Sequence, residues 1–115
     1  MKKAKIYKPT DFYIRADANE TIGIGHVMRC LSIAEEFKRL GGKVKFIIAD
    51  GRSRPMIENK GFETICLNSK WDDLDCETEK LLGILQNNDA ERLLIDSYFV
   101  TAQYLKRLSE HIFTA

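Results

Sequence analysis

Four short apolar runs alternate along this 115-residue chain with segments whose apolar residues recur at helical spacing. The runs predict buried strands, because a strand covered on both faces is apolar along its whole length. Glycines or an Asn-Asn-Asp sequence follow the first three helical segments, as is typical where helices end. The expected strands are 12–16, 44–49, 64–67 and 92–96, and the expected helices are 27–40, 53–60, 77–86 and 101–111.

This alternation predicts an α/β fold with a parallel sheet covered on both faces. Right-handed connections in a doubly wound sheet give the strand order 3-2-1-4. Residues 1–11 carry lysines and are expected to form a solvated basic leader, and residues 12–115 one domain. The sequence stops just after the fourth helix, where a further strand would be expected, so we expect the chain to be a fragment or one half of a two-lobed protein.

Composition bounds the classes of partner. The formal net charge of +1 gives no electrostatic support for a nucleic-acid partner. No segment approaches the roughly 18 apolar residues of a membrane helix, and no apolar run follows the N-terminal charges as in a secretory signal. The three cysteines lack C-x-x-C spacing, so we expect reduced thiols in or near the core of a cytoplasmic protein, without a metal site.

Residues 14–31 predict a buried strand, a polar glycine loop and a helix that begins at a histidine. A helix N-terminus has unpaired N–H groups and a partial positive charge, so it attracts anions and disfavours imidazolium. His26 is therefore expected to be neutral and to act as a general base, with Asp17 as the orienting carboxylate. The alternatives are structural roles, in which the His26 ring donates a hydrogen bond to a carbonyl and Asp17 accepts hydrogen bonds from the amides of its own loop.

Ligands of such sheets bind beyond the carboxyl ends of the strands, where the strand order reverses. The first and fourth strands end there, so Asp17, His26 and the segment 96–98 are expected to face one crevice. Gly23 and Gly25 either permit positive φ or let a phosphate or sugar approach the backbone. Arg29 is expected to be a surface or ion-pair residue. The residues expected to bind substrate are Arg15, Gly23, Ile24, Gly25, Asp96, Ser97 and Tyr98.

A non-catalytic alternative is a nucleotide-binding module. Residues 23–28 read G-x-G-x-x-M, which departs from the dinucleotide motif G-x-G-x-x-G, and the phosphate-loop G-K-[ST] is absent. Asp50 nevertheless stands at the end of the second strand, where a ribose-binding acid would lie. A Rossmann-like module that binds a nicotinamide dinucleotide therefore stays open.

The motif R-A-D-A-N-x-x-I-G-x-G-H-V-M-R-C-L of residues 15–31 resembles the start of the UDP-sugar hydrolases of pseudaminic acid biosynthesis. It is also similar to the related spore-coat polysaccharide biosynthesis proteins. These families later carry a strand that ends I-D-x-Y, and residues 95–98 of this chain match it. The resemblance covers nearly the whole chain from about Phe12.

The resemblance implies the GT-B fold of two facing Rossmann-like lobes, of which this chain would be the N-terminal one. It implies removal of UDP from a diacetamido-trideoxyhexose by water attack at the anomeric carbon, without a metal or other cofactor, and it places the catalytic residue at His26. UDP would be held largely by the absent C-terminal lobe, so this chain alone is expected to be inactive. In a GT-B glycosyltransferase, the runner-up, His26 would deprotonate a sugar hydroxyl instead of water.

Overall fold

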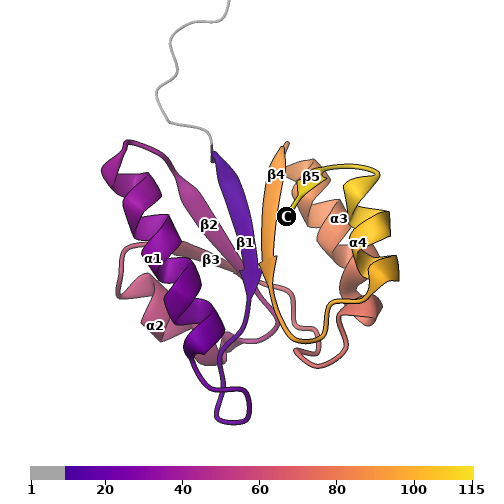
Figure 1. Ribbon diagram of the computed structural model, residues 1–115, viewed down its shortest axis with the longest axis horizontal. Coiled ribbons are helices and arrows are strands. Elements are labelled where there is room, and N and C mark those ends of the chain that lie inside the picture. Colours follow the sequence, from indigo (N-terminus) through magenta and orange to yellow (C-terminus); the bar gives the residue numbers. More distant parts are fainter. Residues whose placement is uncertain (1–9) are drawn as a thin grey trace, which may run out of the picture.

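The computed structural model describes residues 10–115 as a Rossmann-like α/β domain with an all-parallel sheet of order β3-β2-β1-β4-β5 (Figure 1). The predicted fold class and the order 3-2-1-4 are confirmed. The expectation of a fragment assumed that the strand after the fourth helix was missing, but this strand is present as β5. The strands are β1 (Phe12–Ala16), β2 (Val44–Ile48), β3 (Glu63–Cys66), β4 (Arg92–Asp96) and β5 (Phe113–Thr114). The helices are α1 (Gly25–Arg39), α2 (Arg54–Glu58), α3 (Thr78–Asn87) and α4 (Ala102–Ser109), with the short 3₁₀ helices η1 (Gly51–Ser53) and η2 (Leu74–Glu77). Apart from Thr10 and Asp11, the predicted basic leader lies outside the described residues.

Strand β1 is the centre of the sheet and is buried along its whole length. It pairs with β2 on one side and β4 on the other, so Ile14 stands level with Phe46 and with Leu94. Its side chains alternate between two cores, because successive strand residues point to opposite faces. This central position accounts for the apolar character of residues 12–14 and leaves Arg15 in the interior.

Two apolar cores sandwich the sheet, one beneath α1 and α2 and the other beneath α3 and α4 (Figure 1). The first core packs Phe12 and Ile14 of β1 against Val27 and Ala34 of α1. The second includes Tyr13 of β1, and its other members come mainly from β2, η2, α3, β4 and α4. Burial of apolar area on both faces stabilises the fold, at roughly 25 cal/mol per Å².

The two ends of α1 differ in how their backbone groups are satisfied. At its C-terminus, Gly41 adopts φ +93° and donates from its amide to the carbonyl of Lys38, a left-handed helix stop. At its N-terminus, Ile24 is the capping residue and no side chain caps the helix. The first amides of α1 therefore have no side-chain acceptor, in contrast to α4, where Oγ1 of Thr101 accepts from the amide of Tyr104.

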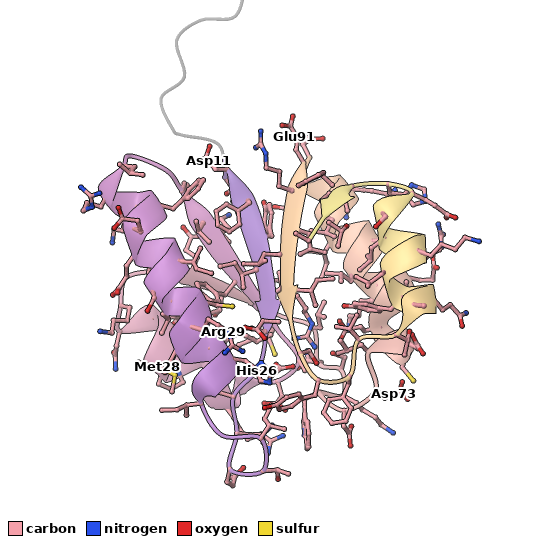
Figure 2. The ribbon with its side chains drawn as sticks, viewed as in Figure 1. Asp11, His26, Met28, Arg29, Asp73 and Glu91 are labelled. Carbon is pink, nitrogen blue, oxygen red and sulfur yellow. The ribbon has the colours of Figure 1, made fainter. Side chains whose placement is uncertain are left out.

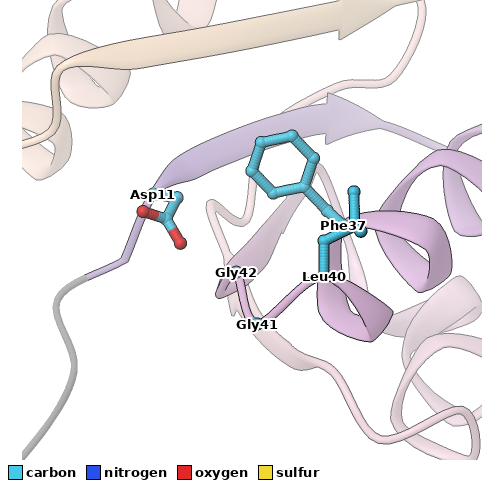
Figure 3. Close-up of a pocket in the computed structure, with 5 residues that line it drawn as sticks. All are labelled: Asp11, Phe37, Leu40, Gly41 and Gly42. Atoms are coloured by element: carbon cyan, nitrogen blue, oxygen red, sulfur yellow. The ribbon is translucent and has the colours of Figure 1, made fainter.

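The amino-terminal edge of the sheet carries a hollow of about 290 Å³ (Figure 3). It is lined by Asp11, Phe37, Leu40, Gly41 and Gly42. Asp11 already accepts a hydrogen bond from the amide of Lys43. The hollow lies at the opposite end of β1 from the residues predicted to be functional. Among residues 10–115, no helix has both the length and the apolar character to cross a membrane.

Candidate functional site

The carboxyl ends of β1 and β4 lie side by side, and the loop after β1 projects beyond them before α1 begins (Figure 1). This topology brings His26, in the first turn of α1, to Asp96, the last residue of β4. Nδ1 of His26 lies 2.5 Å from Oδ1 of Asp96. Figure 2 shows His26 and Arg29 together at this end of the molecule, with Asp11 and Glu91 at the other. The predicted convergence of His26 and Asp96 is therefore present.

The contact with Asp96 defines which ring nitrogen of His26 carries a proton. An ionised carboxylate only accepts hydrogen bonds, so Nδ1 is the N–H and Nε2 of the neutral ring has a free lone pair. His26 is only 5% exposed, but Nε2 has no hydrogen-bond partner among the described residues. Since every fully buried side-chain nitrogen or oxygen of residues 10–115 has a partner, Nε2 keeps contact with solvent.

Arg29 holds the same carboxylate with two bonds. Its Nε donates to Oδ2 of Asp96 at 2.8 Å, and its Nη2 donates to Oδ1 at 3.0 Å. The bonds from Arg29 lower the pKa of Asp96, partial burial opposes them, and the bond from His26 lowers it further. Asp96 is therefore ionised at neutral pH. The prediction of Arg29 as an ion-pair residue is confirmed, but its link to His26 through Asp96 was missed.

Two further side chains surround this pair. The ring of Tyr98 meets the His26 imidazole edge to face, with the ring centroids 4.5 Å apart, and Tyr98 itself is 76% exposed. The thiol of Cys30 lies 3.7 Å from Oδ2 of Asp96. Burial first, and the charge of Asp96 second, raise the pKa of Cys30 to about 12. Cys30 is thus a neutral thiol here and not a nucleophile.

Arg15 and Asp17 take part in a different cluster. Arg15 is 1% exposed, and its Nε and Nη2 donate to the two carboxylate oxygens of Glu77 at 2.7 and 2.8 Å. Its Nη1 donates to Oδ2 of Asp17 at 2.8 Å, while Oδ1 of Asp17 accepts from the amide of Ala49. This corrects the expectation for both residues: Asp96 is the carboxylate bonded to His26, and Arg15 is sealed away from any ligand at the sheet edge.

The buried acid Glu77 had no part in the sequence-based prediction. It also accepts from the hydroxyls of Tyr104, at 2.7 Å, and Ser69, at 2.9 Å. The cluster therefore joins β1, η2, α4 and the loop after β3. An arginine within an otherwise apolar central strand was the available signal, since a buried guanidinium requires an acidic partner.

The other predicted residues lie in the loops at this edge. Gly23 adopts φ +77° and pairs through its backbone with Asn19, which accounts for a glycine there. Gly25 has no positive φ, and a Cβ would meet nothing within 4 Å. Ile24 is half-exposed beside it. Ser97 accepts from the amide of Phe99 through Oγ, a local turn contact.

Asp50, the acid of the dinucleotide alternative, is already partnered. It accepts from the amide of Arg52 at the start of η1 and forms an ion pair with the Arg52 guanidinium at 2.8 Å. Arg52 also reaches Glu20 of the loop after β1. Within residues 10–115, no three His, Cys, Asp or Glu side chains are arranged to hold a metal ion.

In the arrangement that results, Arg29 bonds Asp96 and Asp96 bonds Nδ1 of His26, while Nε2 of the same ring has no partner among residues 10–115. An imidazole held in one tautomer by a carboxylate can take a proton from a hydroxyl or from water. Uncapped helix amides beside it can interact with an anion. Comparisons with protein-family models, curated proteins and solved structures found no match for this chain.

Proposed function

We propose that this chain supplies the general base of a UDP-sugar hydrolase, with a diacetamido-trideoxyhexose as the sugar. The observation that supports it is His26 itself. Its Nδ1 is bonded to an ionised Asp96, and its Nε2, which has no partner in the described part of the chain, is in contact with solvent at the carboxyl edge of the sheet. The resemblance of residues 15–31 to nucleotide-sugar hydrolases supplies the substrate class.

In the proposed reaction, Nε2 of His26 takes a proton from water as the water oxygen bonds to the anomeric carbon. The bond from that carbon to the diphosphate oxygen breaks, and UDP leaves with the electron pair. The imidazolium that forms is stabilised by Asp96, 2.5 Å from Nδ1. A positioned base of this kind contributes roughly 10²–10⁴ in rate.

The departing diphosphate needs N–H donors or positive charge. The uncapped first turn of α1 supplies amides, and the open space at Gly25 lets a phosphate or sugar approach them. These donors do not suffice for a diphosphate, so the proposal includes a second lobe that holds UDP, in a GT-B arrangement. It also places the reaction in the cytoplasm, where the three free thiols remain reduced.

The test incubates the intact protein, with both lobes, with a series of UDP-sugars and no acceptor. We expect free UDP and free sugar, separated by ion-exchange chromatography, and no turnover by His26→Gln of unchanged circular dichroism. Turnover only after an acceptor is added would reject hydrolysis in favour of glycosyl transfer. Near-normal activity of His26→Gln, or micromolar binding of UDP by residues 1–115 alone, would contradict the proposal.

A further inference from the structure

We propose that Arg29 is a positioning residue for the base, acting on His26 through the two hydrogen bonds that it donates to the carboxylate of Asp96. The inference rests on the proposed function for its catalytic consequence, but its structural part can be measured without turnover. It gives a role to a side chain that, by its exposure alone, would be classed as surface charge.

The geometry of the Arg29–Asp96 interaction distinguishes it from an ordinary surface ion pair. Arg29 and His26 lie one helical turn apart on α1, so both reach the same residue of β4. Nε and Nη2 of Arg29 each bond a different oxygen of Asp96, and Nη2 lies 3.3 Å from Nδ1 of His26. With both oxygens engaged by Arg29, the carboxylate cannot turn about its bond to Cβ. Its Oδ1 is thereby fixed in front of Nδ1.

The same guanidinium sets the charge around the imidazole. The groups that face His26 are Arg29 from its own helix, Asp96 from β4 and Tyr98 from the loop after β4. The thiol of Cys30 contacts Oδ2 of Asp96. Arg29 balances the charge of Asp96 and opposes a second positive charge on the ring. Loss of Arg29 therefore favours imidazolium, and the acid limb of the activity profile moves to higher pH.

Substitutions separate the two contributions of Arg29. Lysine keeps the positive charge but presents a single ammonium, so it cannot hold both carboxylate oxygens in the planar geometry of a guanidinium. Glutamine removes both the positive charge and the planar guanidinium geometry. Arg39→Gln is the matched control, because Arg39 is on the same helix and bonds Glu36 at the surface, away from His26.

The experiment follows the ring nitrogens of His26 by NMR in protein labelled with ¹⁵N-histidine, in which only His26 and His111 contribute. We expect the neutral ring of the wild type to be one tautomer, with the proton on Nδ1. Arg29→Gln should give a mixture of tautomers and a His26 titration midpoint at higher pH. Arg29→Lys should give mixed tautomers with a smaller change in midpoint. Arg39→Gln should match the wild type.

Activity provides the second measurement. We expect kcat of Arg29→Gln to fall roughly 10-fold to 100-fold, as when an outer partner that orients a histidine is lost, while KM is unchanged. The role of Arg29 would be overturned if Arg29→Gln left the tautomer and titration midpoint of His26 unaltered while Asp96→Asn clearly changed them. The role of Asp96 in orienting His26 would be unaffected by that result. Changed NMR signals in a protein that hydrolyses no UDP-sugar would support the positioning role and refute the proposed function.

Discussion

Oδ1 of Asp96 lies 2.5 Å from Nδ1 of His26, although 70 residues separate them in the chain. The pair forms because β1 and β4 are neighbours in the sheet and α1 begins beside the end of β4. It brings a ring in the first turn of α1 to a carboxylate that also accepts two hydrogen bonds from Arg29. In the proposed reaction, this carboxylate would stabilise the ring after it takes a proton.

Asp96 and Asp17 are predicted to respond differently to the same substitution. Asp96→Asn should lower kcat by about 10²–10⁴ in a folded protein, because His26 loses the carboxylate that orients it. Asp17→Asn should instead lower the free energy of unfolding by about 1–3 kcal/mol, because the asparagine amide has no negative charge and only one acceptor oxygen for the two donors, Arg15 and the amide of Ala49. Steady-state kinetics and urea unfolding of both variants provide the check. If Asp17→Asn and Asp96→Asn lost the same activity per folded molecule, Asp17 would have to be counted among the catalytic residues.

The buried Arg15–Glu77 pair is predicted to be required for folding stability. Arg15→Met leaves Glu77 and Asp17 buried without their cation, which should cost about 3–5 kcal/mol in urea unfolding. The control is Arg107→Met, which removes an exposed pair with Glu79 and should change the free energy of unfolding far less than Arg15→Met does. If Arg15→Met and Arg107→Met lowered the free energy of unfolding equally, the buried cluster would contribute no more to stability than a surface ion pair.

Stability should fall with acid partly through Asp96. The bonds from Arg29 first, and from His26 second, hold its pKa below the usual value, with partial burial opposing them. The unfolded chain therefore binds this proton at a higher pH than the folded protein does. The stabilisation is present in full above the ordinary carboxyl pKa of about 4, and it is lost as the pH falls from there through the lower pKa of the folded protein.

Urea unfolding of the wild type and Asp96→Asn across this range measures that contribution. We expect a steeper loss in the wild type, so that the two curves converge at low pH. Glu36→Gln, which removes a carboxylate from the exposed surface of α1, is the control and should follow the wild type. Parallel curves for wild type and Asp96→Asn would show that Asp96 does not contribute.

The three thiols should differ in their rates of alkylation. Burial and the neighbouring Asp96 raise the pKa of Cys30 to about 12, so its reactive thiolate is scarce at pH 8. Cys76 is exposed, which corrects the expectation that all three cysteines lie in or near the core. Mass spectrometry after iodoacetamide treatment should find Cys30 modified last in native protein and readily in urea. Early modification of native Cys30 would contradict its placement.

The sequence alone predicted the α/β class, the order of the first four strands and their positions to within about a residue. Strands 12–16 and 92–96 were predicted with the bounds that the structure has. This success has a local cause, because apolar runs, helical spacing and the glycines that end helices are encoded within each segment. The switch point between β1 and β4 then follows from the handedness of the connections.

The tertiary structure alone decided how the polar side chains are paired. Asp17 is nine residues from His26 and Asp96 is seventy, yet Asp96 is the partner, because strand pairing and side-chain direction determine which carboxylate the ring meets. Arg15 stood in a motif that resembles a substrate site, and its place in the central strand turned it inward to Glu77. Periodicity specifies which face of an element is buried, but a hydrogen bond depends on positions to within a fraction of an ångström, and only the packed chain determines these.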